Sequence, residues 1–189
     1  MKKINAKDII IPAVALLLIC LVATTLLALT NNVTAGKISE NSVQKENTSR
    51  TVVLPQAKEF SEVAELENGV SYCTGKDGAE EVGFVFTSKA KGYGGDVTVM
   101  TGMDMDGVIT GIEILSHDET PGLGANSTKP EFKERFKGKS GELAVNKTSN
   151  EGQSVQAITA ATITSRAVVS AVNAASKAFE QIKGGAVNG

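Results

Sequence analysis

An uncharged run of 21 residues, Ile9–Leu29, constrains this chain more than any other feature. A helix of that length is roughly 31 Å long, which matches the hydrocarbon core of a bilayer. The run therefore predicts a single transmembrane helix close to the N-terminus. Because the run contains no charged residue, it offers no candidate for an ion pathway.

A cleaved signal peptide is the alternative interpretation of the same run. Residues 33–35, Val-Thr-Ala, form an acceptable cleavage sequence. However, the apolar region of a signal peptide usually spans only about 7–15 residues. The length of the run favours an anchor that stays attached.

The charges that flank the run predict its orientation. Lys2, Lys3 and Lys7 precede it, and only Asp8 opposes them. The positive-inside rule then keeps residues 1–8 in the cytoplasm. We expect a single-pass protein of the cell (inner) membrane, with its C-terminal domain outside the cytoplasm.

The remainder of the chain is expected to be a linker followed by one folded domain. Residues 30–51 are polar and lack apolar periodicity, which is typical of a linker. Residues 52–189 are enough for one domain. From Lys37 onward there are 16 basic and 20 acidic residues, so the net charge of −4 does not draw this domain to an anionic membrane surface.

The residue types present exclude several classes of function. One histidine, His117, and two cysteines, Cys20 and Cys73, cannot supply the four ligands of a typical structural zinc site or of an iron–sulfur cluster. Few aromatic residues and a whole-chain net charge of −2 argue against nucleic-acid binding. Redox or transfer chemistry would therefore use a bound organic cofactor.

Strand-like segments dominate the middle of the chain. Residues 82–88, 96–103 and 108–116 are rich in strand-forming side chains, and Asp106-Gly107 is a hairpin signal between the last two. Two further short strands are expected at 144–145 and 155–158.

Helical patterns appear later in the chain. Phe132 and Phe136 stand four residues apart, which fits a short amphipathic helix. From about Thr164 to Lys183, apolar residues recur at spacings of three and four and predict one buried helix face, formed by Val168, Val172, Ala175, Phe179 and Ile182. Gly184-Gly185 is expected to end this helix. Hairpins with segregated helices predict an α+β domain with an antiparallel sheet and packed helices.

Three threonines and a serine cluster where the long helix is expected to begin, within residues 159–165. The first turn of a helix has unpaired N–H groups and the positive end of the helix dipole, so a phosphate is stabilised there. The two alanines in this cluster leave room for a bulky ligand. Ordinary capping is the alternative, because Ser and Thr are good N-caps.

The sequence Thr-Ala-Ala-Thr-Ile-Thr-Ser at 159–165 resembles the flavinylation motif of the FMN-binding domain family, roughly Asp-x-x-Ser/Thr-Gly-Ala-Thr. Members carry FMN as a phosphoester on the last threonine, which corresponds to Thr162. Gln156 stands at the Asp position and Ala160 at the Gly position. The resemblance implies covalent FMN on Thr162, with cofactor contacts from Thr159, Ala160, Ala161, Thr164 and Ser165.

Two more segments, Lys-Gly-Tyr-Gly-Gly at 91–95 and His-Asp-Glu-Thr-Pro-Gly-Leu-Gly at 117–124, resemble the G-subunit family of the Rnf ion-translocating electron-transport complexes. The C subunits of sodium-pumping NADH:quinone oxidoreductases are relatives. A length below 200 residues favours the G subunits. The resemblance implies flavin contacts from Tyr93, His117, Glu119, Thr120, Gly122, Leu123 and Gly124.

The roles within this loop follow from residue type. The glycines let backbone amides approach a ligand, and Leu123 can lie on a flavin face. His117, Glu119 and Thr120 carry polar groups that can hydrogen-bond the flavin. For His117, a histidine satisfied by a neighbouring residue is the alternative.

The resemblance implies an electron-carrying flavoprotein subunit without turnover of its own. The complex would couple electron transfer from ferredoxin to NAD⁺ to translocation of Na⁺ or H⁺. The implied partners are the other membrane and iron–sulfur subunits of the Rnf complex and a flavin transferase. The alternatives are the C subunit of a sodium-pumping NADH:quinone reductase, a secreted flavin-dependent reductase, and a membrane-anchored binding module without a cofactor. We expect no catalytic residue, no metal site and no nucleic-acid partner.

Overall fold

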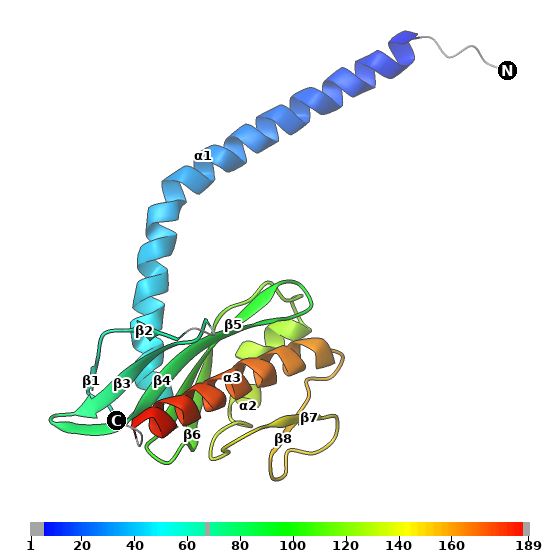
Figure 1. The fold of residues 1–189 in the computed structure, drawn as a ribbon. Coiled ribbons are helices and arrows are strands. Elements are labelled where there is room, and N and C mark those ends of the chain that lie inside the picture. Colours follow the sequence, from blue (N-terminus) through cyan, green and yellow to red (C-terminus); the bar gives the residue numbers. More distant parts are fainter. Residues whose placement is uncertain (1–5, 67–68, 187–189) are drawn as a thin grey trace. The chain divides into compact units, whose positions relative to one another are not determined.

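The computed structural model describes residues 6–66 and 69–186 (Figure 1). The chain divides into two compact units, residues 1–44 and residues 45–189, which are described separately. We call the second unit the C-terminal domain. An N-terminal apolar helix followed by a sheet-and-helix domain confirms the predicted α+β class.

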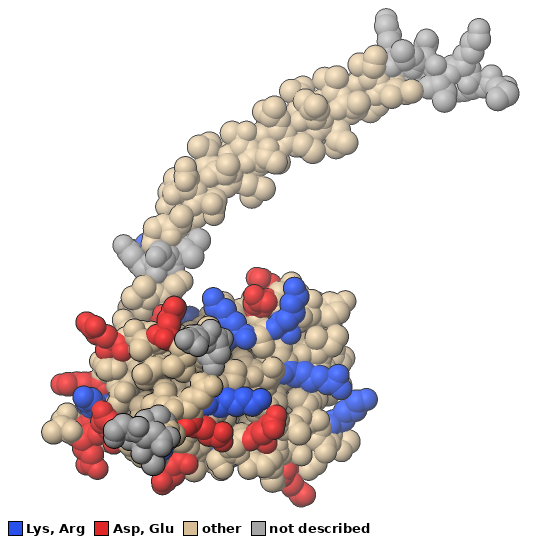
Figure 2. All heavy atoms as spheres, viewed as in Figure 1, with Lys and Arg blue, Asp and Glu red and all other residues tan. Residues whose placement is uncertain are grey.

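The first unit is helical throughout its described residues. Helix α1 spans Ala6–Val53, and its segment Ile9–Lys37 is long and apolar enough to cross a membrane. Threonine hydroxyls in this segment donate to carbonyls one turn earlier, for example Thr25 Oγ1 to Leu21 O at 2.7 Å. Such bonds satisfy the hydroxyls inside an apolar environment. In Figure 2 most of this segment is free of charged side chains, whereas the C-terminal domain carries both signs.

The segment expected as a linker is helical, because α1 continues through it to Val53. Extending a helix that is already nucleated adds one hydrogen bond for each residue ordered, so a polar sequence without proline can follow the apolar part. An ion pair between Arg50 and Glu46, at 2.9 Å and i,i+4 spacing, supports the last turns. The compact C-terminal domain begins at Lys45 and so includes these turns.

The main sheet of the C-terminal domain is antiparallel throughout. Its order is β1-β3-β4-β5-β6, with β2 also paired to β3. The strands are β1 Glu59–Phe60, β2 Ala64–Glu65, β3 Ser71–Asp77, β4 Glu80–Lys91, β5 Asp96–Asp104 and β6 Ile109–Ser116. The three strands predicted from the middle of the chain are β4, β5 and β6. Strands β1, β2 and β3 carry many polar residues and were not predicted.

The hairpin between β5 and β6 forms at the predicted Asp106-Gly107. Asp104 Oδ1 accepts the backbone N–H groups of Asp106 and Val108, both at 2.9 Å. Gly107 has φ +78°, a conformation that glycine adopts without steric cost.

One face of the sheet packs against the long helix α3, Thr162–Ala186 (Figure 1). Of the residues predicted to face the core, Val168, Val172, Ala175 and Phe179 are buried with strand residues such as Phe84, and Ile182 is partly buried against the same cluster. The rings of Phe84 and Phe179 meet edge to face at 5.8 Å. The predicted end of this helix is wrong, since α3 runs through Gly184-Gly185 to Ala186. Glycine lowers helix propensity by only about 1 kcal/mol, and a docked helix overcomes that cost.

The end of α1 covers the opposite face of the sheet. Val53 and Leu54 are fully buried there with Cys73, Val85 and Met100. Lys45 Nζ donates to the backbone oxygens of residues 114 and 115, at 3.1 and 2.5 Å. The last turns of α1 therefore form part of the hydrophobic core of the C-terminal domain.

The segment between β6 and α3 is mostly irregular. It contains the 3₁₀ helix η1 Gly124–Thr128, the short helix α2 Pro130–Lys133, and the strands β7 Ala144–Asn146 and β8 Ser154–Gln156. The predicted amphipathic helix around Phe132 and Phe136 is reduced to α2 and turns, but both rings are buried and meet at 5.4 Å. Strands β7 and β8 pair in parallel, unlike the antiparallel sheet that was expected.

Candidate functional site

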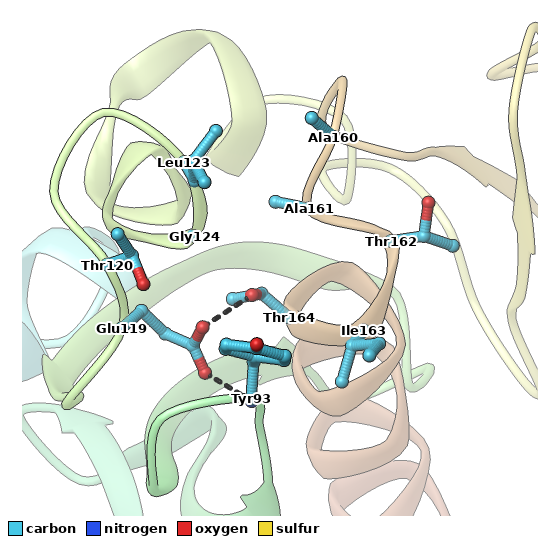
Figure 3. Close-up of a pocket in the computed structure, with 10 residues that line it drawn as sticks. All are labelled: Tyr93, Glu119, Thr120, Leu123, Gly124, Ala160, Ala161, Thr162, Ile163 and Thr164. Carbon is cyan, nitrogen blue, oxygen red and sulfur yellow. Dashed lines mark hydrogen bonds between the residues drawn. The ribbon is translucent and has the colours of Figure 1, made fainter.

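The C-terminal domain contains a pocket of about 530 Å³ (Figure 3). Three segments form its walls: the turn between β4 and β5, the loop after β6, and the start of α3. Its lining residues are Tyr93, Glu119, Thr120, Leu123, Gly124, Ala160, Ala161, Thr162, Ile163 and Thr164.

The antiparallel sheet explains why these segments meet. Strand β4 ends at Lys91 and β5 begins at Asp96, so the 92–95 turn lies where these two strands end, beside the pocket. Ser116, the last residue of β6, pairs with Thr98 near the start of β5, which brings the 117–124 loop to the same end of the strands. Helix α3 packs along β4 and β5 and contributes its N-terminus.

Glu119 lies at the point where the three walls join. The residue is only 6% exposed. Oε1 accepts the backbone N–H of Tyr93 at 2.7 Å, and Oε2 accepts the hydroxyl of Thr164 at 2.7 Å. The structure thus gives both carboxylate oxygens a protein donor.

The loop before α3 is fixed by Ser165. Its hydroxyl accepts the N–H of Ile158 at 2.9 Å and contacts Ala161 O at 3.0 Å, and the side chain is fully buried. Ser165 therefore serves the structure of the loop and does not line the pocket. Within this loop Ala160 has φ +59°, which makes it the one non-glycine residue with positive φ in the described part of the chain.

Thr162 is the first residue of α3 and lines the pocket. Among the residues that the structure describes, none hydrogen-bonds to its half-buried hydroxyl. In Figure 3 the Ala161 methyl group points toward Leu123, whereas the Thr162 side chain lies on the side of the loop away from Glu119. The first turn of a 25-residue helix stabilises negative charge, so this end of the pocket suits a phosphate.

Large apolar side chains surround the mouth of the pocket. Tyr93 is 73% exposed, Ile163 52% and Leu123 43%. Exposed apolar groups gathered around a cavity are typical of a ligand-binding site. Ile163 was not predicted as a site residue; its position on the first turn, directly after the proposed acceptor, was the available signal.

Besides Ser165, three of the predicted contacts do not line this pocket. Gly122 and Thr159 line a neighbouring pocket of about 500 Å³, which shares Leu123 and Ala160 with the first. His117 lines neither pocket; its Nδ1 accepts the N–H of Glu119 at 3.2 Å, which agrees with the alternative of a histidine satisfied by a neighbour.

Comparisons with known proteins match both parts of the chain. The FMN-binding domain family matches residues 92–177, and the RnfG N-terminal region matches residues 1–51. Residues 92–177 contain all three walls of the pocket.

Two curated relatives align over most of their length. The G subunit of the Na(+)-translocating ferredoxin:NAD(+) oxidoreductase complex of Acetobacterium woodii is 42% identical over 186 residues, covering 88% of this chain and 89% of that protein. The G subunit of the proton-translocating ferredoxin:NAD(+) oxidoreductase complex of Clostridium ljungdahlii is 32% identical over 168 residues, again 88% and 89%.

A solved structure is similar in fold. The crystal structure of the C subunit of the Na(+)-translocating NADH-quinone reductase of Parabacteroides distasonis matches with a TM-score of 0.50 and 25% identity, over 59% of this chain and 60% of that one. Because the G subunits match more of the chain at higher identity, they are favoured over the C subunits. The chain therefore belongs to the G subunits of the ion-translocating oxidoreductase complexes, and its C-terminal domain includes an FMN-binding domain.

Proposed function

We propose that this chain holds FMN in the pocket at the start of α3, joined by a phosphoester to Thr162. The flavin carries electrons within a membrane-bound complex that couples transfer from ferredoxin to NAD⁺ to the movement of Na⁺ or H⁺. The observation that carries this proposal is the convergence of the two motif segments, 117–124 and 159–165, on one pocket within the family-matched region.

The pocket fits FMN in size and in the chemistry of its walls. Small-molecule sites usually have volumes of about 300–1,000 Å³, and this pocket has about 530 Å³. The Thr162 hydroxyl and the N-terminus of α3 suit the phosphate, while Leu123, Ile163 and Tyr93 suit an apolar ring. When bound, FMN supplies the redox chemistry, since a flavin accepts and donates electrons.

The residues of this chain bind and orient the cofactor. Ala160 and Ala161 bring the backbone close to the cofactor because their side chains are small. Leu123 and Ile163 exclude water from the ring, and the exposed Thr120 hydroxyl is available to a polar edge of the flavin. No residue of the chain is assigned a catalytic role, because the protein's part is to position and tune the cofactor.

The more distant predicted residues act indirectly in this proposal. His117 orients the backbone of Glu119, and Ser165 holds the loop that carries the acceptor. Gly122 and Thr159 shape the neighbouring pocket, whose wall at Leu123 and Ala160 is shared.

We further propose that residues 1–8 lie in the cytoplasm and that the C-terminal domain lies outside it, at the inner membrane. The three lysines before the apolar run support this orientation. A covalent link suits that location, where lost FMN would not be readily replaced. The proposal requires a flavin transferase for attachment and the other subunits of the complex for turnover.

Thr162→Ala tests the acceptor directly. The full chain, coexpressed with a flavin transferase, should give a fluorescent band on a denaturing gel and an added intact mass of one FMN less one water. Thr162→Ala should abolish both signals, and Thr162→Ser, which keeps a hydroxyl, should retain them.

Thr159→Ala is the matched control. It removes an exposed hydroxyl that belongs to the same loop but lines the neighbouring pocket. It should keep the covalent flavin. Covalent flavin on Thr162→Ala would overturn the assignment of the acceptor. A colourless wild-type protein would instead favour the binding-module alternative.

A further inference from the structure

Both carboxylate oxygens of Glu119 accept hydrogen bonds from other groups of the protein. Glu119 is only 6% exposed, and a buried carboxylate needs hydrogen-bond donors for both oxygens because burying an unpaired charge is costly. Here Oε1 has the N–H of Tyr93 at 2.7 Å, with Gly94 N a longer contact at 3.4 Å, and Oε2 has the Thr164 hydroxyl at 2.7 Å. The carboxylate is therefore already paired before any ligand is considered.

The two partners belong to different walls of the pocket. Tyr93 lies in the turn between β4 and β5, Thr164 lies in the first turn of α3, and Glu119 itself lies in the loop after β6 (Figure 3). The partners are 26 and 45 residues away in sequence. One side chain thus connects all three segments that line the pocket.

Two neighbouring glycines leave the space that the Glu119 carboxylate occupies. A Cβ at Gly92 would overlap Glu119 Oε1, and one at Gly124 would overlap Glu119 Oε2 and lie 2.5 Å from Thr164 Oγ1. Because packed interiors transmit strain, a shift of the Glu119 carboxylate would displace the neighbouring segments. The spacing of the pocket walls therefore depends on the position of this carboxylate. The N–H of Glu119 is in turn held by His117 Nδ1 at 3.2 Å.

We propose that Glu119 is a positioning residue, and that Thr164 is its partner on α3. Its carboxylate fixes the spacing of the three pocket walls and so determines how firmly the flavin ring is held. The effect on the flavin ring rests on the proposed function. The spacing of the walls is a property of the protein alone and can be tested without a flavin.

The first experiment compares two isosteric variants on the same helical turn, in the full chain in detergent and made without a flavin transferase. Thr164→Val removes the hydroxyl that donates to Glu119, and Thr162→Val removes a hydroxyl without a protein partner among the described residues. Hydrogen–deuterium exchange is followed by mass spectrometry on peptides covering residues 90–97, which contain Tyr93.

Thr164→Val should speed exchange in these peptides about tenfold, as expected for loss of one buried hydrogen bond to a charged group. Thr162→Val and Thr164→Ser should match the wild type. The effect must cross from α3 to the β4–β5 turn through Glu119. Unchanged exchange in Thr164→Val would therefore overturn the positioning role. Equal acceleration in Thr162→Val would do the same, because it would show a general effect of altering α3.

The second experiment uses flavin-loaded protein, in which Thr162 remains intact. Thr164→Val should keep the covalent flavin but lower its fluorescence anisotropy and change its visible circular dichroism. Glu119→Gln, which keeps one acceptor oxygen, should change both signals less than Glu119→Ala. Unchanged signals in all three variants would overturn the link between Glu119 and the ring. Absence of flavin from the wild type would count against the proposed function, while the exchange experiment would still decide the positioning role.

Discussion

Ala160→Gly should make the protein more stable, although it removes a side chain. The φ angle of Ala160 is +59°, in the left-handed region. An L-residue there costs about 1–2 kcal/mol relative to right-handed conformations. Glycine avoids that cost but loses more backbone entropy on folding, about 0.5–1 kcal/mol. Because Ala160 is exposed, little packing is lost, and the free energy of unfolding should rise by about 0.5–1 kcal/mol.

Ala161→Gly provides a control at the next residue. Ala161 is 7% exposed and does not have a positive φ. The change there loses a buried methyl group, worth about 0.8 kcal/mol, and adds the same entropy cost. The free energy of unfolding should therefore fall by about 1–2 kcal/mol.

Both variants are measured by urea unfolding of the full chain in detergent, followed by circular dichroism. The expected result is a higher urea midpoint for Ala160→Gly and a lower one for Ala161→Gly, with unchanged slopes. The melting temperature of Ala160→Gly should rise by about 2–3 °C for a domain of this size. If both variants lose stability equally, the backbone at Ala160 is not strained and the reasoning is refuted.

Three further outcomes are expected. Gly124→Ala should lower the free energy of unfolding by about 2–3 kcal/mol and reduce flavin incorporation, because its Cβ would meet buried side-chain atoms; Gly122→Ala, at φ +78° in open space, should cost only about 1 kcal/mol and keep the flavin. Urea unfolding and absorbance at the flavin band measure both, and equal losses would contradict the packing argument. Burial raises the pKa of the Cys73 thiol above its usual 9.0, despite the nearby Arg50. The unfolded chain then releases this proton at lower pH than the folded domain, so the free energy of unfolding should fall as the pH rises above about 9. Cys73→Ala should show a smaller fall between pH 8 and 10, and an identical fall would contradict the assignment. A reporter that is active only outside the cytoplasm, fused after the last residue, should be active; activity from a cytoplasm-only reporter would reverse the proposed orientation.

Several elements could be predicted from the sequence because their causes are local. The uncharged run of α1, the hairpin turn at Asp106-Gly107 and the apolar stripe of α3 each depend on residues within a few positions of one another. The two motif segments were found for a similar reason, since each is short and continuous. Their meeting in one pocket depends on the fold: the pairing of β5 with β6 brings the 117–124 loop there, and the packing of α3 on β4 and β5 brings residues 159–165.

Tertiary contacts decided the features that local pattern does not contain. Strand β3 carries polar residues and is stabilised by pairing on both edges. The polar part of α1 is helical because an apolar helix precedes it and because its last residues are buried against the sheet. In both cases the neighbours overrode a weak local preference.

The roles of individual site residues were also decided by the tertiary structure. The motif match singles out Thr162, but nothing in the local sequence shows that the hydroxyl of Thr164 donates to Glu119 while that of Thr162 has no partner among the described residues. Likewise, Glu119 lines the pocket, but only the fold shows that both of its oxygens have protein donors from distant segments. A sequence determines which groups are available at a site, whereas the partner that each group takes depends on which segments the fold brings within about 3 Å.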